Sequence, residues 1–116
     1  MFSFKKKYFL IIESIKDIDL EHIKKRNKFI IIYRKIGKFE EVAELLKYRK
    51  RCKSKNIKFF VANDLVLAVR LGSDGVYLSA KNRSFKTLNL NRKNFNIIGS
   101  AHNIKEINLK KKQGCK

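Results

Sequence analysis

Five short runs of apolar, β-branched and aromatic residues recur along this chain, and longer segments separate them. The runs cover residues 8–12, 29–33, 58–62, 75–78 and 95–99. The segments between them include stretches with apolar residues at helical spacing, so strand and helix are expected to alternate. This alternation is typical of repeated β–α units that build a parallel sheet. The runs are apolar at successive positions, which predicts strands that are covered on both faces.

The segments between and after the strands predict three helices and a short helical segment over about residues 20–25. The first helix runs from Gly37 to about Ser54, with Glu40 and Glu41 in its first turn and basic residues in its last. The second covers residues 64–71 and is apolar almost all round. The core face of the first helix is expected to consist of Phe39, Val42, Ala43 and Leu46.

The last helix has a clear start and a clear end in the sequence. Asn103 and Glu106 form an N-cap and capping-box pattern, and Ile104 and Ile107 follow inside the helix. Gly114 stands where a C′ glycine belongs. The segment 79–94 has no clear period, and we expect a loop there with one helical turn near residues 84–88. The chain is therefore read as one α/β domain over residues 1–116. Its sheet is either open and doubly wound or part of a (β/α)₈ barrel.

A formal charge of +19 raises the possibility of a nucleic-acid partner. However, 22 of the 29 basic residues are lysine, and Ile, Asn and Phe are also abundant. All these residue types have AT-rich codons, so base composition alone can produce the charge. The basic runs at 24–28, 47–55 and 110–112 fall at predicted helix ends, where cations complement the helix dipole and remain solvated. No zinc-finger or RNP-type motif accompanies them, so nucleic-acid binding is the less favoured reading.

Composition also bears on the compartment. Cys52 and Cys115 lack metal-ligand spacing, which favours free thiols in a reducing compartment, and Cys52 is read as a thiol on a helix face. The apolar run at 8–12 ends at Glu13 and is too short for a signal peptide or a membrane span. The chain is expected to be cytoplasmic, with no membrane partner.

The pair Asn63-Asp64 follows the third strand and precedes the second helix. Asn and Asp are preferred helix caps, and capping alone would account for them. The same position is also the edge at which parallel α/β proteins collect ligand-binding groups. Both readings stay open on the residues alone.

Four segments, in order, resemble the thiamine phosphate synthase family, which also includes the thiazole tautomerases. They are IIIYRK (30–35), FFVAND (59–64), LGSDGVYL (71–78) and IIGSAHNIKEI (97–107). The resemblance covers about residues 29–114. It implies a TIM barrel and a protein of thiamine biosynthesis that couples hydroxymethylpyrimidine diphosphate to thiazole phosphate, with Mg²⁺ as cofactor and release of pyrophosphate.

The resemblance also implies roles for individual residues. Arg34 and Asn63 would bind the substrate diphosphate, and Asp64 would be a Mg²⁺ ligand. Ser100 would bind the substrate near the reacting groups. His102 is similar to the proton-transferring histidine of the tautomerase branch, and it could equally be a polar residue at a helix start. Cations and Mg²⁺ suit a diphosphate leaving group, because negative charge develops on it as the bond breaks.

Some positions depart from the family pattern. Ile32 and Ile36 stand where the family has Gln and Lys, and Asn82 stands where it has a second acidic Mg²⁺ ligand. Tyr77 replaces the usual His of the fourth strand, and Ile98 stands at a usual Gly. These departures motivate an alternative function, a non-catalytic or tautomerase-like descendant that binds phosphorylated ligands.

Length sets a further expectation. A (β/α)₈ barrel needs about 250 residues, whereas 116 residues supply five strands. The chain is therefore expected to be the N-terminal part of a longer barrel, or a half-barrel that must pair with another copy. Open sheet edges predict possible self-association.

Overall fold

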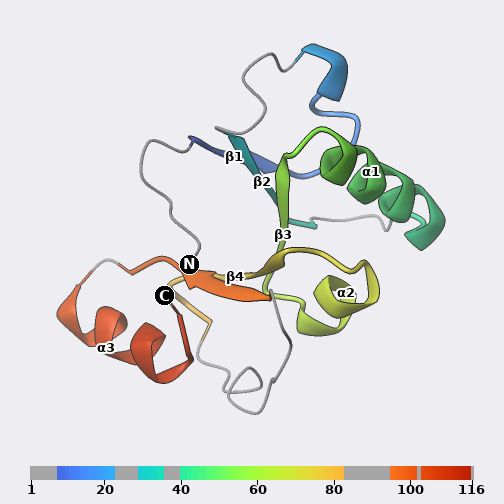
Figure 1. Ribbon diagram of the computed structural model, residues 1–116. Helices are drawn as coiled ribbons and strands as arrows, with labels where there is room; N and C mark the ends of the chain where they lie inside the picture. Colours follow the sequence, from blue (N-terminus) through green and yellow to red (C-terminus); the bar gives the residue numbers. More distant parts are fainter. Residues whose placement is uncertain (1–7, 23–28, 36–39, 83–94, 102, 116) are drawn as a thin grey trace.

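The computed structural model describes residues 8–22, 29–35, 40–82, 95–101 and 103–115, in which five strands alternate with helices (Figure 1). The elements are β1 (Tyr8–Ile12), the 3₁₀ helix η1 (Leu20–His22), β2 (Phe29–Tyr33), α1 (Val42–Ser54), β3 (Lys58–Ala62), α2 (Leu65–Arg70), β4 (Gly75–Leu78), β5 (Asn96–Gly99) and α3 (Ile104–Lys112). The first four strands have the predicted bounds, and β5 begins one residue later than expected.

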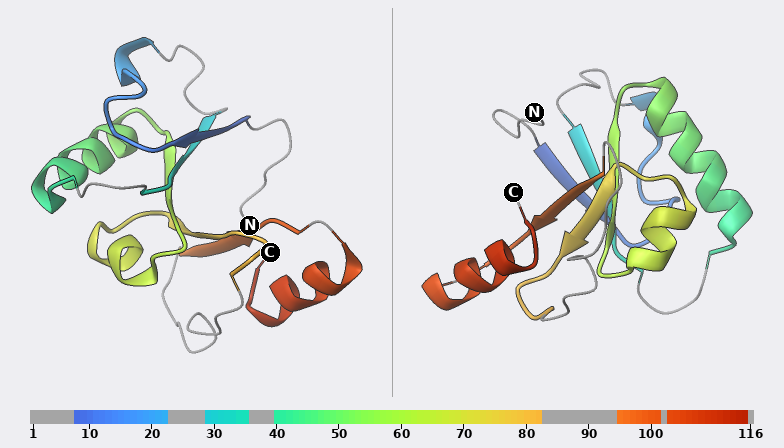
Figure 2. Two further views of the ribbon diagram at one scale, coloured as in Figure 1. Left: turned by 180° about the vertical axis from the view of Figure 1, so that it is seen from behind. Right: turned by 60° about the horizontal axis from the view of Figure 1, so that its bottom comes forward.

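All five strands are parallel and lie side by side in chain order, β1-β2-β3-β4-β5. A doubly wound sheet reverses its strand order at a switch point, and this sheet does not. Strictly sequential parallel strands are the arrangement of a (β/α)₈ barrel. Figure 2 shows the sheet twisting strongly from β1 to β5. The fold is therefore α/β with an open, five-stranded parallel sheet of the kind found in part of a barrel, as predicted.

Alternate residues of the strands supply two separate cores. One core joins the strands to the helices, and Ile31, Phe59 and Val76 are among its fully buried residues. The second lies on the opposite face of the sheet and contains Ile30, Ile32, Phe60, Ala62 and Ile98. In a barrel that second face is the interior. Burial of both faces confirms the reading of the apolar runs.

The edge strand β1 is more exposed than the other strands of the sheet. Tyr8 is 61% exposed, Phe9 46% and Ile11 53%. An apolar edge strand is a common site of association between chains. Self-association through this edge stays a prediction.

Helix α1 differs from the prediction in its start and in its buried face. It begins at Val42 with Glu41 at the N-cap, so the two glutamates precede the helix; residues 36–39 lie outside the described part of the chain. Its buried residues are Leu45, Tyr48, Arg49 and Cys52, whereas Ala43 is exposed. Val42 and Leu46 of the predicted face do pack against the core, and Phe39 lies outside the described residues. The prediction was wrong at Ala43 and missed the buried Arg49, because apolar character alone was used to locate the face.

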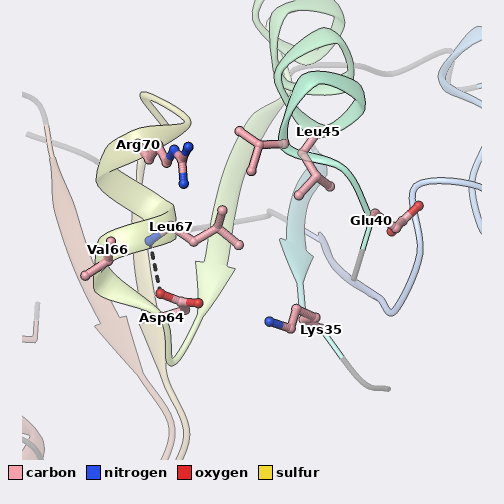
Figure 3. Close-up of a pocket in the computed structure, with 8 residues that line it drawn as sticks. Lys35, Glu40, Leu45, Asp64, Val66, Leu67 and Arg70 are labelled. Carbon is pink, nitrogen blue, oxygen red and sulfur yellow. Dashed lines mark hydrogen bonds between the residues drawn. The ribbon is translucent and has the colours of Figure 1, made fainter. Parts of the chain in front are cut away.

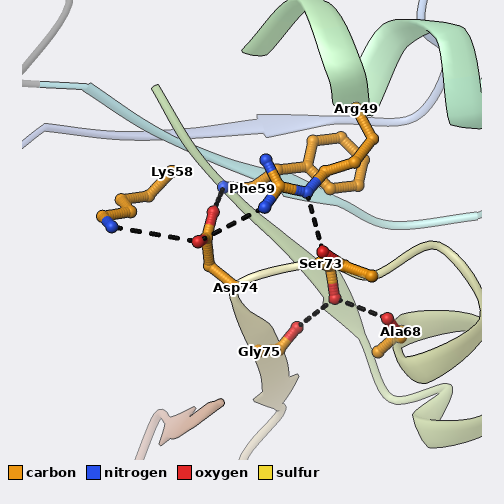
Figure 4. Close-up of polar contacts among 8 residues, drawn as sticks. Arg49, Lys58, Phe59, Ala68, Ser73, Asp74 and Gly75 are labelled. Carbon is orange, nitrogen blue, oxygen red and sulfur yellow. Dashed lines mark hydrogen bonds and ion pairs between the residues drawn. The ribbon is translucent and has the colours of Figure 1, made fainter. Parts of the chain in front are cut away.

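Arg49 belongs to a polar network at the amino ends of β3 and β4 (Figure 4). Its Nε donates to the carbonyl of Gly72 at 3.1 Å, and its Nη2 lies 3.4 Å from the Asp74 carboxylate. Asp74 also accepts a hydrogen bond from the Phe59 backbone N–H at 2.9 Å, and Lys58 lies 3.8 Å from it. The predicted solvation of the basic run 47–55 is therefore wrong at Arg49, which is only 6% exposed.

The short helix α2 is confirmed, and the signals at both ends of α3 are confirmed as well. The Asn103 side chain accepts the backbone N–H of Glu106 at 2.9 Å, and Gly114 has the positive φ of +94° that suits a C′ glycine. In contrast, Ile104 is 76% exposed while Lys110 is 5% exposed. The expectation of solvated lysines at 110–112 is thus wrong for Lys110. The expected turn at residues 84–88 and the basic run 24–28 lie outside the described residues.

Both cysteines are free thiols, as expected. Cys52 lies on helix α1, as expected, and is fully buried, which raises the pKa of its thiol to about 12. Burial also raises the pKa of Cys115. Among the described helices, none has the length and apolar character required to span a membrane.

Candidate functional site

The carboxyl ends of the five strands meet at one edge of the sheet, because the strands are parallel. Backbone hydrogen bonds extend the strand pairing past the strand ends. Arg34 N–H donates to the Ile12 carbonyl at 2.8 Å, Asn63 N–H to Tyr77 at 2.7 Å, and Ser100 N–H to Leu78 at 3.1 Å. The structure therefore places Arg34, Asn63 and Ser100 along the same edge, at the ends of β2, β3 and β5.

Asn63 ends β3 by turning the chain into the left-handed region, with φ of +59°. Asn tolerates this conformation better than most residues. Its side-chain Oδ1 accepts the backbone N–H of Ser79 and the side-chain amide of Asn82, both at 2.9 Å. Two donors at this atom identify it as the amide oxygen, which leaves the Nδ2 group as the end available to a ligand.

Asp64 is the N-cap of α2. Its Oδ1 accepts the backbone N–H of Leu67 at 3.0 Å. The capping reading of this residue is therefore confirmed, and it does not exclude a ligand role for the second carboxylate oxygen. In Figure 3 that oxygen faces the side from which Lys35 approaches.

Lys35 and Asp64 belong to a small pocket on the helix-facing side of the edge, between α1 and α2 (Figure 3). Its volume is about 160 Å³. Charged groups of both signs surround an apolar floor. The lining residues are Lys35, Glu40, Val42, Leu45, Asp64, Val66, Leu67 and Arg70. A pocket of this size holds a small chemical group rather than a whole substrate.

Arg34 extends toward β1, not toward β3. Its Nη2 lies 3.5 Å from the Glu13 carboxylate, and both side chains are about half exposed. An ion pair with this exposure contributes little stability, so a phosphate could displace Glu13 at small cost. Arg34, the consecutive pair Asn63-Asp64 and Ser100 share an edge, with no hydrogen bond or ion pair from Arg34 to the others among the described contacts.

Glu40 is a structural residue at this edge that the sequence reading missed. Its carboxylate accepts hydrogen bonds from Ser14 Oγ, the Ile15 N–H and the Tyr33 hydroxyl, each at 3.1 Å. These contacts attach the segment after β1 to the end of β2. Burial, together with the hydrogen bond to Glu40, raises the pKa of Tyr33 to about 12. The only sequence signal was a Glu pair before a helix, which was attributed to the first helical turn.

The remaining predicted positions fall in three groups. Ser100 is partly buried at the end of β5. Ile32 stands where the family has Gln; it is 2% exposed and packs in the core on the second face of the sheet. His102 and Ile36 lie outside the described residues, so their placement stays a prediction.

The acidic groups bear on Mg²⁺ binding. No group of three or more His, Cys, Asp or Glu side chains converges in the described part of the chain. The single carboxylate of Asp64 does not make a preformed metal site. It does fit a Mg²⁺ ion that arrives with a diphosphate, because Mg²⁺ is commonly held by one or two carboxylates together with substrate phosphates and water.

Sequential parallel strands, covering helices and polar groups at the carboxyl edge define a protein of the (β/α) barrel class. The sequence profile of the thiamine monophosphate synthase family matches residues 10–116, which is most of the chain. The chain therefore belongs to this family. Comparison with curated protein sequences gave no match.

Proposed function

We propose that the chain acts as a thiamine phosphate synthase-type protein that binds phosphorylated substrates at the carboxyl edge of its sheet. Family membership over residues 10–116 carries the proposal. The arrangement of Arg34, Asn63 and Ser100 along one edge of the sheet, at the ends of β2, β3 and β5, supports it. The reaction would join hydroxymethylpyrimidine diphosphate to thiazole phosphate and release pyrophosphate, in the cytoplasm.

Each residue would contribute a different interaction. Arg34 would exchange its exposed partner Glu13 for diphosphate oxygens, to which a guanidinium can donate two parallel hydrogen bonds. Asn63 would donate from Nδ2, since its Oδ1 already accepts two hydrogen bonds. Ser100 would donate a hydrogen bond to the substrate near the pyrimidine. These groups would orient the diphosphate before it leaves.

Asp64 would hold the Mg²⁺ ion through the carboxylate oxygen that does not cap α2. When bound, Mg²⁺ neutralises the charge that develops on the departing diphosphate. The rest of the metal's ligands would be diphosphate oxygens and water.

The direct test is incubation of the chain with both substrates and Mg²⁺, followed by chromatographic detection of thiamine phosphate. The proposal predicts product formation that depends on the chain and decreases in the Arg34→Ala variant. Absence of product, together with absence of binding of thiazole phosphate or pyrophosphate, would overturn it.

A second function, non-catalytic or tautomerase-like binding of a phosphorylated ligand, is favoured by one observation. Asn82 stands where a second acidic ligand is expected, and its amide is bonded to Asn63. An amide in place of a carboxylate leaves the edge with one negative charge fewer and better suited to an anion than to a metal. Ligand binding without thiamine phosphate formation would support this function, and product formation would exclude its non-catalytic form.

A further inference from the structure

Lys110 and Gln113 are polar residues near the end of α3 that the structure buries almost completely. Lys110 is 5% exposed and Gln113 is 0% exposed. Burying an ammonium group is costly unless hydrogen bonds replace its water. The Lys110 Nζ donates to the Gln113 Oε1 and to the Asn82 carbonyl, both at 2.7 Å. Lengths this short are typical of charge-assisted hydrogen bonds.

The two side chains converge on one backbone atom. Gln113 Nε2 also donates to the Asn82 carbonyl, at 2.9 Å. A carbonyl oxygen has two lone pairs, and here α3 supplies a donor to each. Two side chains at the C-terminal end of α3 thus hold the backbone of Asn82, which is distant from them in the sequence.

Asn82 transmits this constraint to the candidate site. Its side-chain amide donates to Asn63 Oδ1, and the neighbouring Ser79 N–H donates to the same oxygen. An unbroken series of hydrogen bonds therefore runs from α3 through Asn82 to Asn63. With the oxygen held by two donors, the direction of the Asn63 Nδ2 group is fixed. That group has no hydrogen-bond partner among the residues that the structure describes.

Gly99 provides the space for this arrangement. A Cβ at this position would lie 2.7 Å from Lys110 Cδ and 2.9 Å from Cys115 Sγ. Real Cβ atoms do not approach other atoms so closely. A glycine at the end of β5 thus lets the lysine stem reach the segment after β4.

We infer that Lys110 and Gln113 are positioning residues that orient the Asn63 amide toward a bound phosphate group. The inference rests on the proposed function, because it assigns the Nδ2 group of Asn63 to the phosphorylated ligand. A purely structural role for the pair, attaching α3 to β4 and β5, is the competing explanation. The two explanations differ in what they predict for ligand affinity in a folded variant.

The test uses the full chain, inorganic pyrophosphate as the probe, and isothermal titration calorimetry well below the unfolding temperature. Gln113→Met removes one donor without changing charge, and Lys110→Met removes the other while keeping the stem. Lys111→Met is the matched control, since it removes the same charge from an exposed neighbour. We expect affinity to fall about threefold in Gln113→Met and about tenfold in Lys110→Met, with little change in the control.

A second measurement does not depend on a ligand. The side-chain amide resonances of Asn63 in the free chain, recorded by NMR, should shift in both variants and stay in place in the control. If Gln113→Met binds pyrophosphate with wild-type affinity and its Asn63 resonances are unshifted, the inference is overturned while the proposed function stands. A loss of affinity confined to Lys110→Met would also overturn it, because charge would then explain the effect. Failure of the unaltered chain to bind pyrophosphate would overturn the proposed function and the inference with it.

Discussion

The side-chain amide of Asn82 donates a 2.9 Å hydrogen bond to the side-chain oxygen of Asn63, joining the segment after β4 to the end of β3. This contact occupies the position at which a second acidic metal ligand was expected from the family resemblance. The replacement of the family's acidic residue by Asn82 therefore has a structural consequence. Where the family has a carboxylate, this edge has an amide donor that fixes the orientation of the Asn63 side chain.

An acidic residue at position 82 should therefore lower the free energy of unfolding of the protein without ligand. Asn82→Asp removes the donor and places a carboxylate against the Asn63 oxygen, and we expect a loss of about 1–2 kcal/mol in the free energy of unfolding at pH 7. The introduced carboxyl can donate only when protonated, so its pKa should be raised in the folded state. Its contribution to stability is then present below about pH 4 and lost as pH rises. Urea unfolding at pH 7 and at about pH 4 measures both effects, and Asn108→Asp on the exposed surface of α3 is the control. Equal stability of the two variants at pH 7 would count against the role of the Asn82 donor.

Asp64 should separate helix capping from metal binding. Asp64→Ala removes the N-cap of α2 and should cost about 1 kcal/mol, whereas Asp64→Asn keeps an oxygen for the Leu67 N–H and should cost much less. Both variants should lose any increase in pyrophosphate affinity that Mg²⁺ produces. Thermal unfolding and calorimetric titration with and without Mg²⁺ measure the two effects. Retention of the Mg²⁺ effect in Asp64→Asn would show that another group binds the metal.

The network at the opposite end of the strands should dominate stability. Asp74→Ala leaves the 8%-exposed side chain of Arg49 without its carboxylate partner, and we expect a loss of about 3 kcal/mol or more in the free energy of unfolding. Glu44→Ala removes an exposed ion pair with Lys47 and should change stability little. Denaturant unfolding compares them. Similar effects of the two substitutions would contradict the buried pairing.

The thiols should differ in reactivity. Burial raises the pKa of Cys52 to about 12, so this thiol should be inert to an alkylating reagent at pH 8 in the folded chain and react once urea unfolds it. Cys115 is less buried and should react first. Because the folded pKa of Cys52 exceeds the unfolded value, its stabilising contribution is present below about pH 9 and lost toward pH 12. Mass spectrometry of the time course identifies the modified residue; early labelling of Cys52 would contradict its burial.

Strands and helix caps were predictable because their signals are local. β2 and β3 have the predicted bounds, since each is built around consecutive β-branched and aromatic residues. Asn103 and Gly114 mark the ends of α3 by their intrinsic conformational preferences. Both signals act within a few residues, and tertiary packing did not override them.

The buried polar residues were not predictable in this way. Arg49 and Lys110 lie in basic runs that resemble solvated helix ends, and each is buried because a partner distant in sequence satisfies it. The same holds for Glu40, whose partners precede it by seven to 26 residues. Residue type and spacing contain no information about such partners. The strand pattern therefore predicted that Arg34, Asn63, Asp64 and Ser100 follow strand ends at one edge, whereas their contacts emerged only from the structure and their roles stay a prediction.

The central claim is that the carboxyl edge of the sheet holds phosphorylated ligands, and chemical-shift mapping tests it most directly. Pyrophosphate and thiazole phosphate are titrated separately into the ¹⁵N-labelled chain at physiological ionic strength. The account predicts saturable shifts concentrated at Arg34, Asn63, Asp64, Ser79 and Ser100. Weak, unsaturable shifts spread over the exposed lysines would show that the anions respond only to the charge of +19, and would contradict the account.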